Sequence, residues 1–328
     1  MMRPNEYHVI LQNFPVAPGK LPMRVVGPLS EQLLKLAVGV VRLNFEGRSD
    51  RPGKQPEWVQ TATDINYTAL ESAPNGQTGL ALEAPQLGDV LVGGAYQGFF
   101  QEPLGTGDIA RESALGLTIQ AIQQATGQVV APAGSGLVDR GILRQLQNMA
   151  DLFPVGNDQA SLLIHNQQEA SRVVINRKVL RELRTSGVQI QAPERVQVSG
   201  QLEAMQFSAA DARVIVDNRK IRIFIPPALL RGLGQFFGQN VLVQGLANYN
   251  AAGQITAIEA KTITEATPQQ FTLFQQLPRS MSIAPSLEQL RKEQKYRGND
   301  VAKVRQLARE MNIEESYEEL LQQLRDNA

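Results

Sequence analysis

The sequence has no cysteine among its 328 residues and only two histidines, His8 and His165. The absence of cysteine excludes a disulfide-stabilised scaffold, thiolate metal sites and a cysteine nucleophile. Two histidines are too few for a site that needs three histidine ligands, and we expect each to have an ordinary structural role. No motif in the chain predicts a cofactor.

The chain also lacks a long apolar run. Residues 33–41 are apolar except for Lys35, which is about half the length that a membrane span requires. Residues 9–11 are too short for the core of a signal peptide. These absences predict a cytoplasmic protein without a membrane segment.

The chain also has no net charge, since 32 basic side chains balance 32 acidic ones. The balance hides a gradient, because residues 171–231 carry 11 basic and 5 acidic side chains. This local excess of positive charge is the feature of the composition that points most directly to a partner.

Residues 1–158 are predicted to form a mixed α+β domain. Short apolar stretches bounded by proline and glycine indicate strands, at residues 9–11, 23–26, 38–45 and 79–82. Ser30 is a candidate N-cap of a short helix, and residues 48–56 form a charged, exposed loop. Apolar residues at helical spacing predict helices over residues 108–125 and 137–153.

Residues 159–194 are predicted to form a helical bridge, because basic residues recur through it at helical intervals until Gly187. Residues 195–266 then carry the order of three strands, one helix and two strands, which is typical of the OB-fold, a small five-stranded barrel. Gly200 would let the first strand bend. Asp217 and Asn218 favour a turn between the second and third strands.

The predicted barrel also carries candidate nucleic-acid-binding residues. Four of them are cations, and two are aromatic side chains that would stack on bases: Arg213, Arg219, Lys220, Arg222, Phe224 and Tyr249. Strand alternation places Arg222 and Phe224 on one face, opposite the isoleucines at 221, 223 and 225. The alternative is an ordinary solvated strand face with Phe224 packed under a loop.

Residues 267–328 are predicted to form a linker and a helical tail, with capping boxes that begin at Ser286 and Ser316. An apolar stripe along these helices would suit a groove on a partner protein. The candidate partner-binding residues are Val304, Leu307, Met311, Tyr317, Leu320, Leu321 and Leu324.

Two resemblances accompany these patterns. The segments LNFEGRSDRPGKQPEWVQTATD and LEAPQLGD, together with the barrel sequence from RVQVSG to TAIEA, resemble a family of uncharacterised bacterial proteins. The tail SLEQLRKEQKYRGNDVAKVRQLAREMNIEESYEELLQQL is similar to antitoxin segments that wrap a PIN-type nuclease. The second resemblance implies a protein partner for the tail.

Three functional hypotheses follow from the sequence. The first is a non-enzymatic regulatory protein whose tail engages a protein partner, as in an antitoxin. The second is a single-stranded nucleic-acid-binding protein that acts through the barrel. The third is an enzyme with a site near Asp50, Trp58 and Asp64, although no catalytic motif is present.

Overall fold

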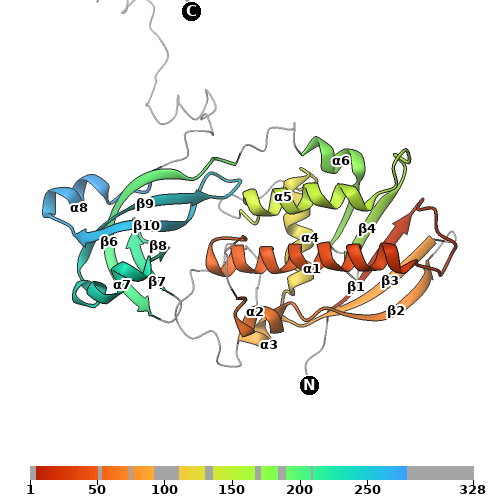
Figure 1. Ribbon diagram of the computed structural model, residues 1–328, viewed down its shortest axis with the longest axis horizontal. Coiled ribbons are helices and arrows are strands. Elements are labelled where there is room, and N and C mark those ends of the chain that lie inside the picture. Colours follow the sequence, from red (N-terminus) through yellow and green to blue (C-terminus); the bar gives the residue numbers. More distant parts are fainter. Residues whose placement is uncertain are drawn as a thin grey trace, which may run out of the picture. The chain divides into compact units, whose positions relative to one another are not determined.

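An antiparallel sheet with its helices and a closed barrel follow one another along the chain (Figure 1). The structure is a computed structural model. It describes residues 5–50, 54–73, 77–91, 111–129, 136–166, 171–183, 190–207 and 210–278. The sheet with its helices and the barrel belong to one compact unit. The α+β class predicted from the sequence is confirmed.

The sheet has five strands in the order β2-β3-β1-β4-β5, and every neighbouring pair is antiparallel. The strands are β1 (Asn5–Gln12), β2 (Asn66–Ala73), β3 (Gln77–Ala84), β4 (Ser161–Asn166) and β5 (Arg172–Asn176). The strands predicted at residues 9–11 and 79–82 are therefore confirmed, as parts of β1 and β3. At the β5 edge, the Gln123 and Gln128 side-chain amides donate to the carbonyls of Arg172 and Val174. These hydrogen bonds satisfy two backbone carbonyls on the edge strand β5.

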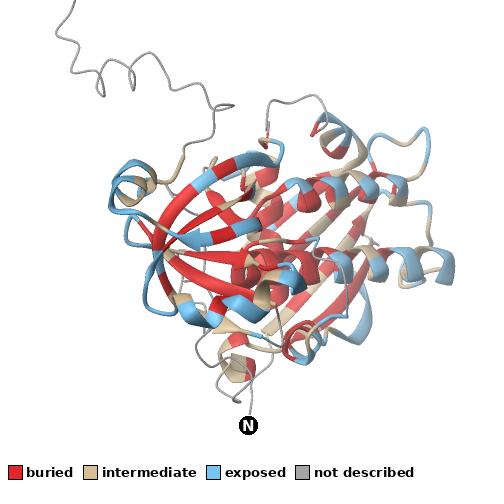
Figure 2. Ribbon diagram, turned by 60° about the vertical axis from the view of Figure 1, so that its left-hand side comes forward, coloured by how far each residue is buried: buried red, intermediate tan, exposed pale blue. Residues whose placement is uncertain are grey.

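Helices cover one face of this sheet. They are α1 (Met23–Glu46), α2 (Glu57–Ala62), α3 (Leu87–Val90), α4 (Ala114–Ala125), α5 (Arg140–Asn148), a 3-10 helix η3 (Met149–Leu152) and α6 (Arg177–Glu182). Val9 of β1 and Ile164 of β4 share a buried core with Leu36, Ile119 and Ile142 of the helices. Figure 2 shows the buried parts of strands and helices in red. Residues 114–125 and 140–152 are helical, which confirms most of the two predicted amphipathic helices.

The strands predicted at residues 23–26 and 38–45 are wrong, because both stretches lie in α1. Every residue from 36 to 46 is buried, since α1 packs against α2, α4, α5 and η3. When a helix is buried on every side, its sequence is apolar all round. It then lacks the alternation of apolar and polar residues at helical spacing by which a helix is recognised. The predicted start at Ser30 is also wrong: its hydroxyl lies inside α1 and donates to the Val26 carbonyl at 2.6 Å.

The helical bridge predicted over residues 159–194 is wrong for residues 161–176, which form β4 and β5. Burial alternates along β5, with Val173 and Ile175 turned into the core. Among the described residues of this stretch, the helix is α6, where the Asn176 side chain accepts a hydrogen bond from the Val179 amide at 2.8 Å. The basic residues that suggested a long helix are therefore divided between a strand and a short helix.

The second part of the fold is a closed five-stranded barrel in the order β10-β8-β7-β6-β9. Its strands are β6 (Glu194–Gln206), β7 (Asp211–Val216), β8 (Arg219–Phe224), β9 (Asn240–Tyr249) and β10 (Ile255–Glu265). Helix α7 (Pro227–Leu233) and the 3-10 helix η4 (Gly234–Phe236) lie between β8 and β9. β8 and β10 are parallel and the other pairs are antiparallel. The barrel predicted from the sequence is confirmed, and it is consistent with an OB-like fold.

Two glycines permit this closure. A Cβ atom at Gly200 would collide with the Ile215 carbonyl, and one at Gly245 would collide with the Glu259 carbonyl. The β7–β8 turn also behaves as predicted, since Asp217 and Asn218 both adopt positive φ, at 51° and 59°. Paired positive φ values are typical of the tight turns that match the twist of a hairpin.

After the barrel comes α8 (Pro268–Phe274), whose Thr267 and Gln270 form a capping box. The sequence predicts a linker at this point, where the structure has a short helix. The predicted tail helices, with Ser286 and Ser316, lie outside the described residues. In the part of the chain that the structure describes, no helix has the length and apolarity to cross a membrane.

Candidate nucleic-acid interface

Three of the four predicted cations lie on the outer side of β7 and β8, because the alternate residues of these strands are in the barrel core. With an acidic and an aromatic neighbour they form what we call the β7–β8 face: Asp211, Arg213, Lys220, Arg222 and Phe224. Glu203 of β6 lies beside two of them. Its Oε2 is 3.3 Å from Arg213 Nη1, and its Oε1 is 3.6 Å from Lys220 Nζ. The structure thus brings Arg213 and Lys220 together, but around a carboxylate.

Arg222 is also ion-paired, with Asp211. Both side chains are buried, with exposed fractions of 5% for Arg222 and 1% for Asp211. The Arg222 guanidinium carbon lies 5.3 Å from the centroid of the Phe224 ring, which makes a cation–π contact. Arg222 and Phe224 are therefore neighbours as predicted, but the buried guanidinium does not lie on an open platform.

The two remaining candidates lie apart from this cluster. Arg219 is exposed at the first position of β8. Tyr249 is buried at the end of β9, where it packs in the barrel core. Burial, and secondly the charge of Glu194, raise the pKa of Tyr249, so its phenol remains neutral at physiological pH.

A groove runs over the barrel on the side of β6, β9 and β10. This β6–β9–β10 groove has an open volume of ≈ 770 Å³. Its lining residues are Arg195, Val196, Gln197, Pro226, Gln244, Gly245, Leu246, Glu259, Ala260 and Lys261. Arg195 and Gln197 face outward from β6 because the alternate residues Val196 and Val198 are in the barrel core.

The cations of this groove differ from those of the β7–β8 face. Within the described ranges, the side chains of Arg195 and Lys261 have no hydrogen-bond or ion-pair partner. Glu259, the acidic residue of the groove, is ion-paired with Arg48, which follows α1. The groove therefore presents two available positive charges above a largely apolar floor.

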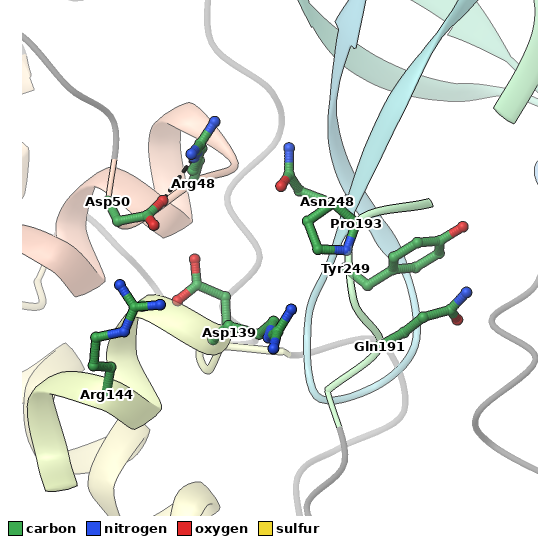
Figure 3. Close-up of a pocket in the computed structure, with 10 residues that line it drawn as sticks. Arg48, Asp50, Asp139, Arg144, Gln191, Pro193, Asn248 and Tyr249 are labelled. Atoms are coloured by element: carbon green, nitrogen blue, oxygen red, sulfur yellow. Dashed lines mark hydrogen bonds and ion pairs between the residues drawn. The ribbon is translucent and has the colours of Figure 1, made fainter. Parts of the chain in front are cut away.

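A second cavity adjoins the groove. This junction pocket, of ≈ 170 Å³, is lined by Arg48, Asp50, Asp139, Arg140, Gly141, Arg144, Gln191, Pro193, Asn248 and Tyr249. Figure 3 shows Asp50, Asp139 and Arg144 on one side of it, opposite Asn248, Pro193 and Tyr249. Glu259 of the groove contacts two residues of the pocket: it pairs with Arg48 and accepts a hydrogen bond of 3.4 Å from the Asn248 side-chain amide.

Backbone and side-chain contacts fix the walls of the junction pocket. The Ala251 amide, in the β9–β10 loop, donates to the Val138 carbonyl at 2.7 Å. A Cβ at Gly136 would collide with the Asn250 side chain, and one at Gly141 would collide with the Ser49 hydroxyl. The glycines are therefore needed where these segments approach each other.

Asp139 is the N-cap of α5 and has three donors around its carboxylate. The Ser49 hydroxyl, the Ser49 amide and the Ile142 amide donate to it at 2.6, 3.0 and 2.9 Å. Burial raises the pKa of Asp139, although these hydrogen bonds oppose the shift. Asp139 therefore has a structural role. Its hydrogen bonds also account for the burial of Ser49, which lies in a segment that the sequence predicts to be an exposed loop.

Two arginines of the junction pocket are available for a ligand. Arg140 and Arg144 lie one turn apart on α5, and both are exposed. Neither side chain forms a hydrogen bond or an ion pair with another described residue. Arg48, by contrast, is occupied by Asp50 at 2.6 Å and by Glu259.

The residues of the enzyme hypothesis do not gather into one site. Asp50 lines the junction pocket, whereas Trp58 is buried against Phe45 with ring centroids 5.7 Å apart. Asp64 is exposed after α2. Across the described ranges, no group of three or more potential ligands from histidine, cysteine, aspartate and glutamate is placed to hold a metal ion.

Apart from Asp50 and Tyr249, which line the junction pocket, sequence reasoning missed the residues that make the two cavities. The segment DRGILR at 139–144 holds a signal that could have been found, since an aspartate N-cap precedes two arginines on one helix face. Lys261 has no such signal, because a bulge in β10 shifts the register between Ala260 and Thr262. The predicted partner-binding residues between Val304 and Leu324 lie outside the described residues.

No family model, curated protein or solved structure matches this chain. The function therefore has to be argued from the geometry alone.

Proposed function

We propose that the protein binds single-stranded nucleic acid along the β6–β9–β10 groove and into the junction pocket. The observation that carries this proposal is the difference in charge pairing between the two faces of the barrel. Arg140, Arg144, Arg195 and Lys261 have no acidic partner within the described ranges, whereas Arg213, Lys220 and Arg222 have one.

An unpaired cation can neutralise a phosphate without first giving up an ion pair of its own. The four side chains line two neighbouring cavities, since Glu259 of the groove contacts Arg48 and Asn248 of the pocket. An extended polyanion matches such an arrangement better than a single small anion does. OB-like barrels commonly bind such chains.

The groove also predicts the kind of recognition. None of its described lining residues is aromatic, so base stacking contributes little there. Binding should depend mainly on the phosphate backbone, with weak sequence preference and a steep dependence on salt. Four phosphate contacts to a single strand would give a slope of about −2.8 in log affinity against log salt.

The test is a fluorescence anisotropy titration of the full chain with a labelled single strand of mixed sequence, repeated at several salt concentrations. The groove variant carries Arg195→Ala and Lys261→Ala, and its slope should be shallower by about 1.4. The matched control carries Arg219→Ala and Lys220→Ala, which remove the same charge near the β7–β8 turn.

The proposal fails if the wild-type chain shows no binding at low salt, or if the control variant loses as much affinity as the groove variant. A duplex of the same sequence serves as the second ligand. Preference for the duplex would contradict the single-strand assignment.

The hypothesis of a protein partner for the tail rests on residues outside the described part of the chain. It stays a prediction from the sequence, tested by truncation before Ile283 and a pull-down with nuclease treatment. Retention of every bound protein after truncation would contradict it.

A further inference from the structure

The chain has only two histidines, and the fold places them side by side. His8 of β1 and His165 of β4 are direct partners in the antiparallel register. Their rings are stacked, with centroids 5.2 Å apart and an interplanar angle of 22°. They lie on the side of the sheet away from the helices, because the neighbouring residues Tyr7, Val9 and Ile164 are in the core under the helices.

The surroundings of the rings determine which nitrogen is available. Nδ1 of His165 lies 2.9 Å from the Asn166 carbonyl oxygen, and a carbonyl can only accept a hydrogen bond. Nδ1 must therefore carry the proton, which leaves the lone pair of the neutral ring on Nε2. Nδ1 of His8 faces a carboxylate, Glu71 Oε2, at 3.6 Å, which favours the same tautomer.

This pattern is the one found around metal-binding histidines, which usually donate their second ring N–H to a carboxylate or a backbone carbonyl. We propose that His8 and His165 form a two-imidazole site for a divalent transition metal ion, toward which the two stacked rings would turn their Nε2 atoms. Solvent has access to it, since the His8 side chain is 25% exposed. Water would complete the coordination, because no described third ligand joins the pair.

The identity of the metal follows from the ligands. Imidazole nitrogen suits copper, nickel and zinc, and among divalent first-row ions the affinity of such a site is highest for Cu²⁺. Two neighbouring charges modify the affinity in opposite directions. Glu71 favours a cation, whereas Arg172 is the register partner of His165 on β5 and repels one.

The test is calorimetric titration of the untagged full chain with Cu²⁺, followed by Ni²⁺ and Zn²⁺. The site should bind one Cu²⁺ per chain, and His8→Gln and His165→Gln should each weaken binding by at least about tenfold. Absorption spectroscopy of the copper-loaded chain should show imidazole ligation, which a purely structural role for the histidines would not produce.

Two further variants keep the proposal falsifiable if a histidine variant fails to fold. Glu71→Gln should weaken binding by about tenfold, and Arg172→Gln should strengthen it, since each changes only a neighbouring charge. Copper affinity that is unchanged in both variants, or retained in a folded His8→Gln chain, would overturn the proposal. The proposed binding of single-stranded nucleic acid by the barrel does not involve these residues, so either proposal can fail without the other.

Discussion

The two cation-bearing faces of the barrel differ in what lies beside each cation. On the β7–β8 face, Glu203 lies between Arg213 and Lys220, and Asp211 lies against Arg222. In the β6–β9–β10 groove, Arg195 and Lys261 have no acidic partner among the residues that the structure describes. The first set of charges contributes to the fold, and the second is available to a ligand.

This difference shows why a count of basic residues does not locate a binding surface. Residues 171–231 have the largest local excess of positive charge, and that excess draws attention to β7 and β8. The acidic partners come from β6 and β7, at positions 203 and 211, so strand pairing decides which cations they neutralise. Lys261, a key groove residue, lies outside the basic stretch altogether.

The largest effect is expected from Asp211→Ala. It removes the carboxylate beside the buried Arg222 guanidinium, and such a loss costs about 3–5 kcal/mol of unfolding free energy. Urea denaturation would measure it, with Lys261→Ala as a control that should change stability by less than about 0.5 kcal/mol. If the two variants are equally stable, the β7–β8 charges do not support the fold.

A smaller effect is expected from Glu203→Gln, which leaves Lys220 without its described carboxylate. Because Glu203 and Lys220 are about one-third exposed, the loss of stability should be no more than about 1 kcal/mol. The affinity for single-stranded nucleic acid at low salt should rise by a few-fold, since a new cation becomes available on the β7–β8 face. Unchanged or weaker binding in the anisotropy assay would show that ion pairing with Glu203 does not limit nucleic-acid binding by the β7–β8 face.

The smallest effect concerns Asp139, in the wall of the junction pocket. Burial raises the pKa of Asp139, so the folded chain holds this proton more tightly than the unfolded chain does. The stabilisation that protonation provides is full below the unfolded pKa of about 4 and is lost as the pH rises through the folded value. The pH dependence of this contribution to stability is therefore opposite in sign to that of an ion-paired carboxylate.

Asp139→Asn removes this titration and keeps an oxygen acceptor for the Ile142 amide. The stability of the variant relative to the wild type should increase as the pH is raised from about 4 to about 7. Denaturation midpoints at several pH values would measure the trend. A difference that is constant with pH, or that declines, would contradict the direction given for this pKa.

The barrel could be predicted closely from the sequence because its signals are local. Alternating isoleucines in β8, the Asp217–Asn218 turn and Gly200 each act over a few residues, and each is found in the structure. The sheet and its helices could not be predicted as well. The valines at 38, 40 and 41 favour a strand by propensity, but burial on every side places them in α1.

The candidate site was the least predictable part. The junction pocket joins residues near 48, 140, 192 and 248, and only the tertiary fold brings these four segments together. The two histidines are separated by more than 150 residues, and nothing in their spacing reveals that β1 pairs with β4. Pairing between distant strands carries no short-range sequence signal.

The most direct test of the central claim is to map where a bound strand touches the barrel. A photo-reactive single strand would be cross-linked to the full chain at low salt, and the modified peptides identified by mass spectrometry. We predict cross-links in residues 195–197, 244–246 and 259–261, which line the groove. Cross-links concentrated in residues 211–216 and 220–224 would contradict the account, because they would place the nucleic acid on the face whose cations are already paired.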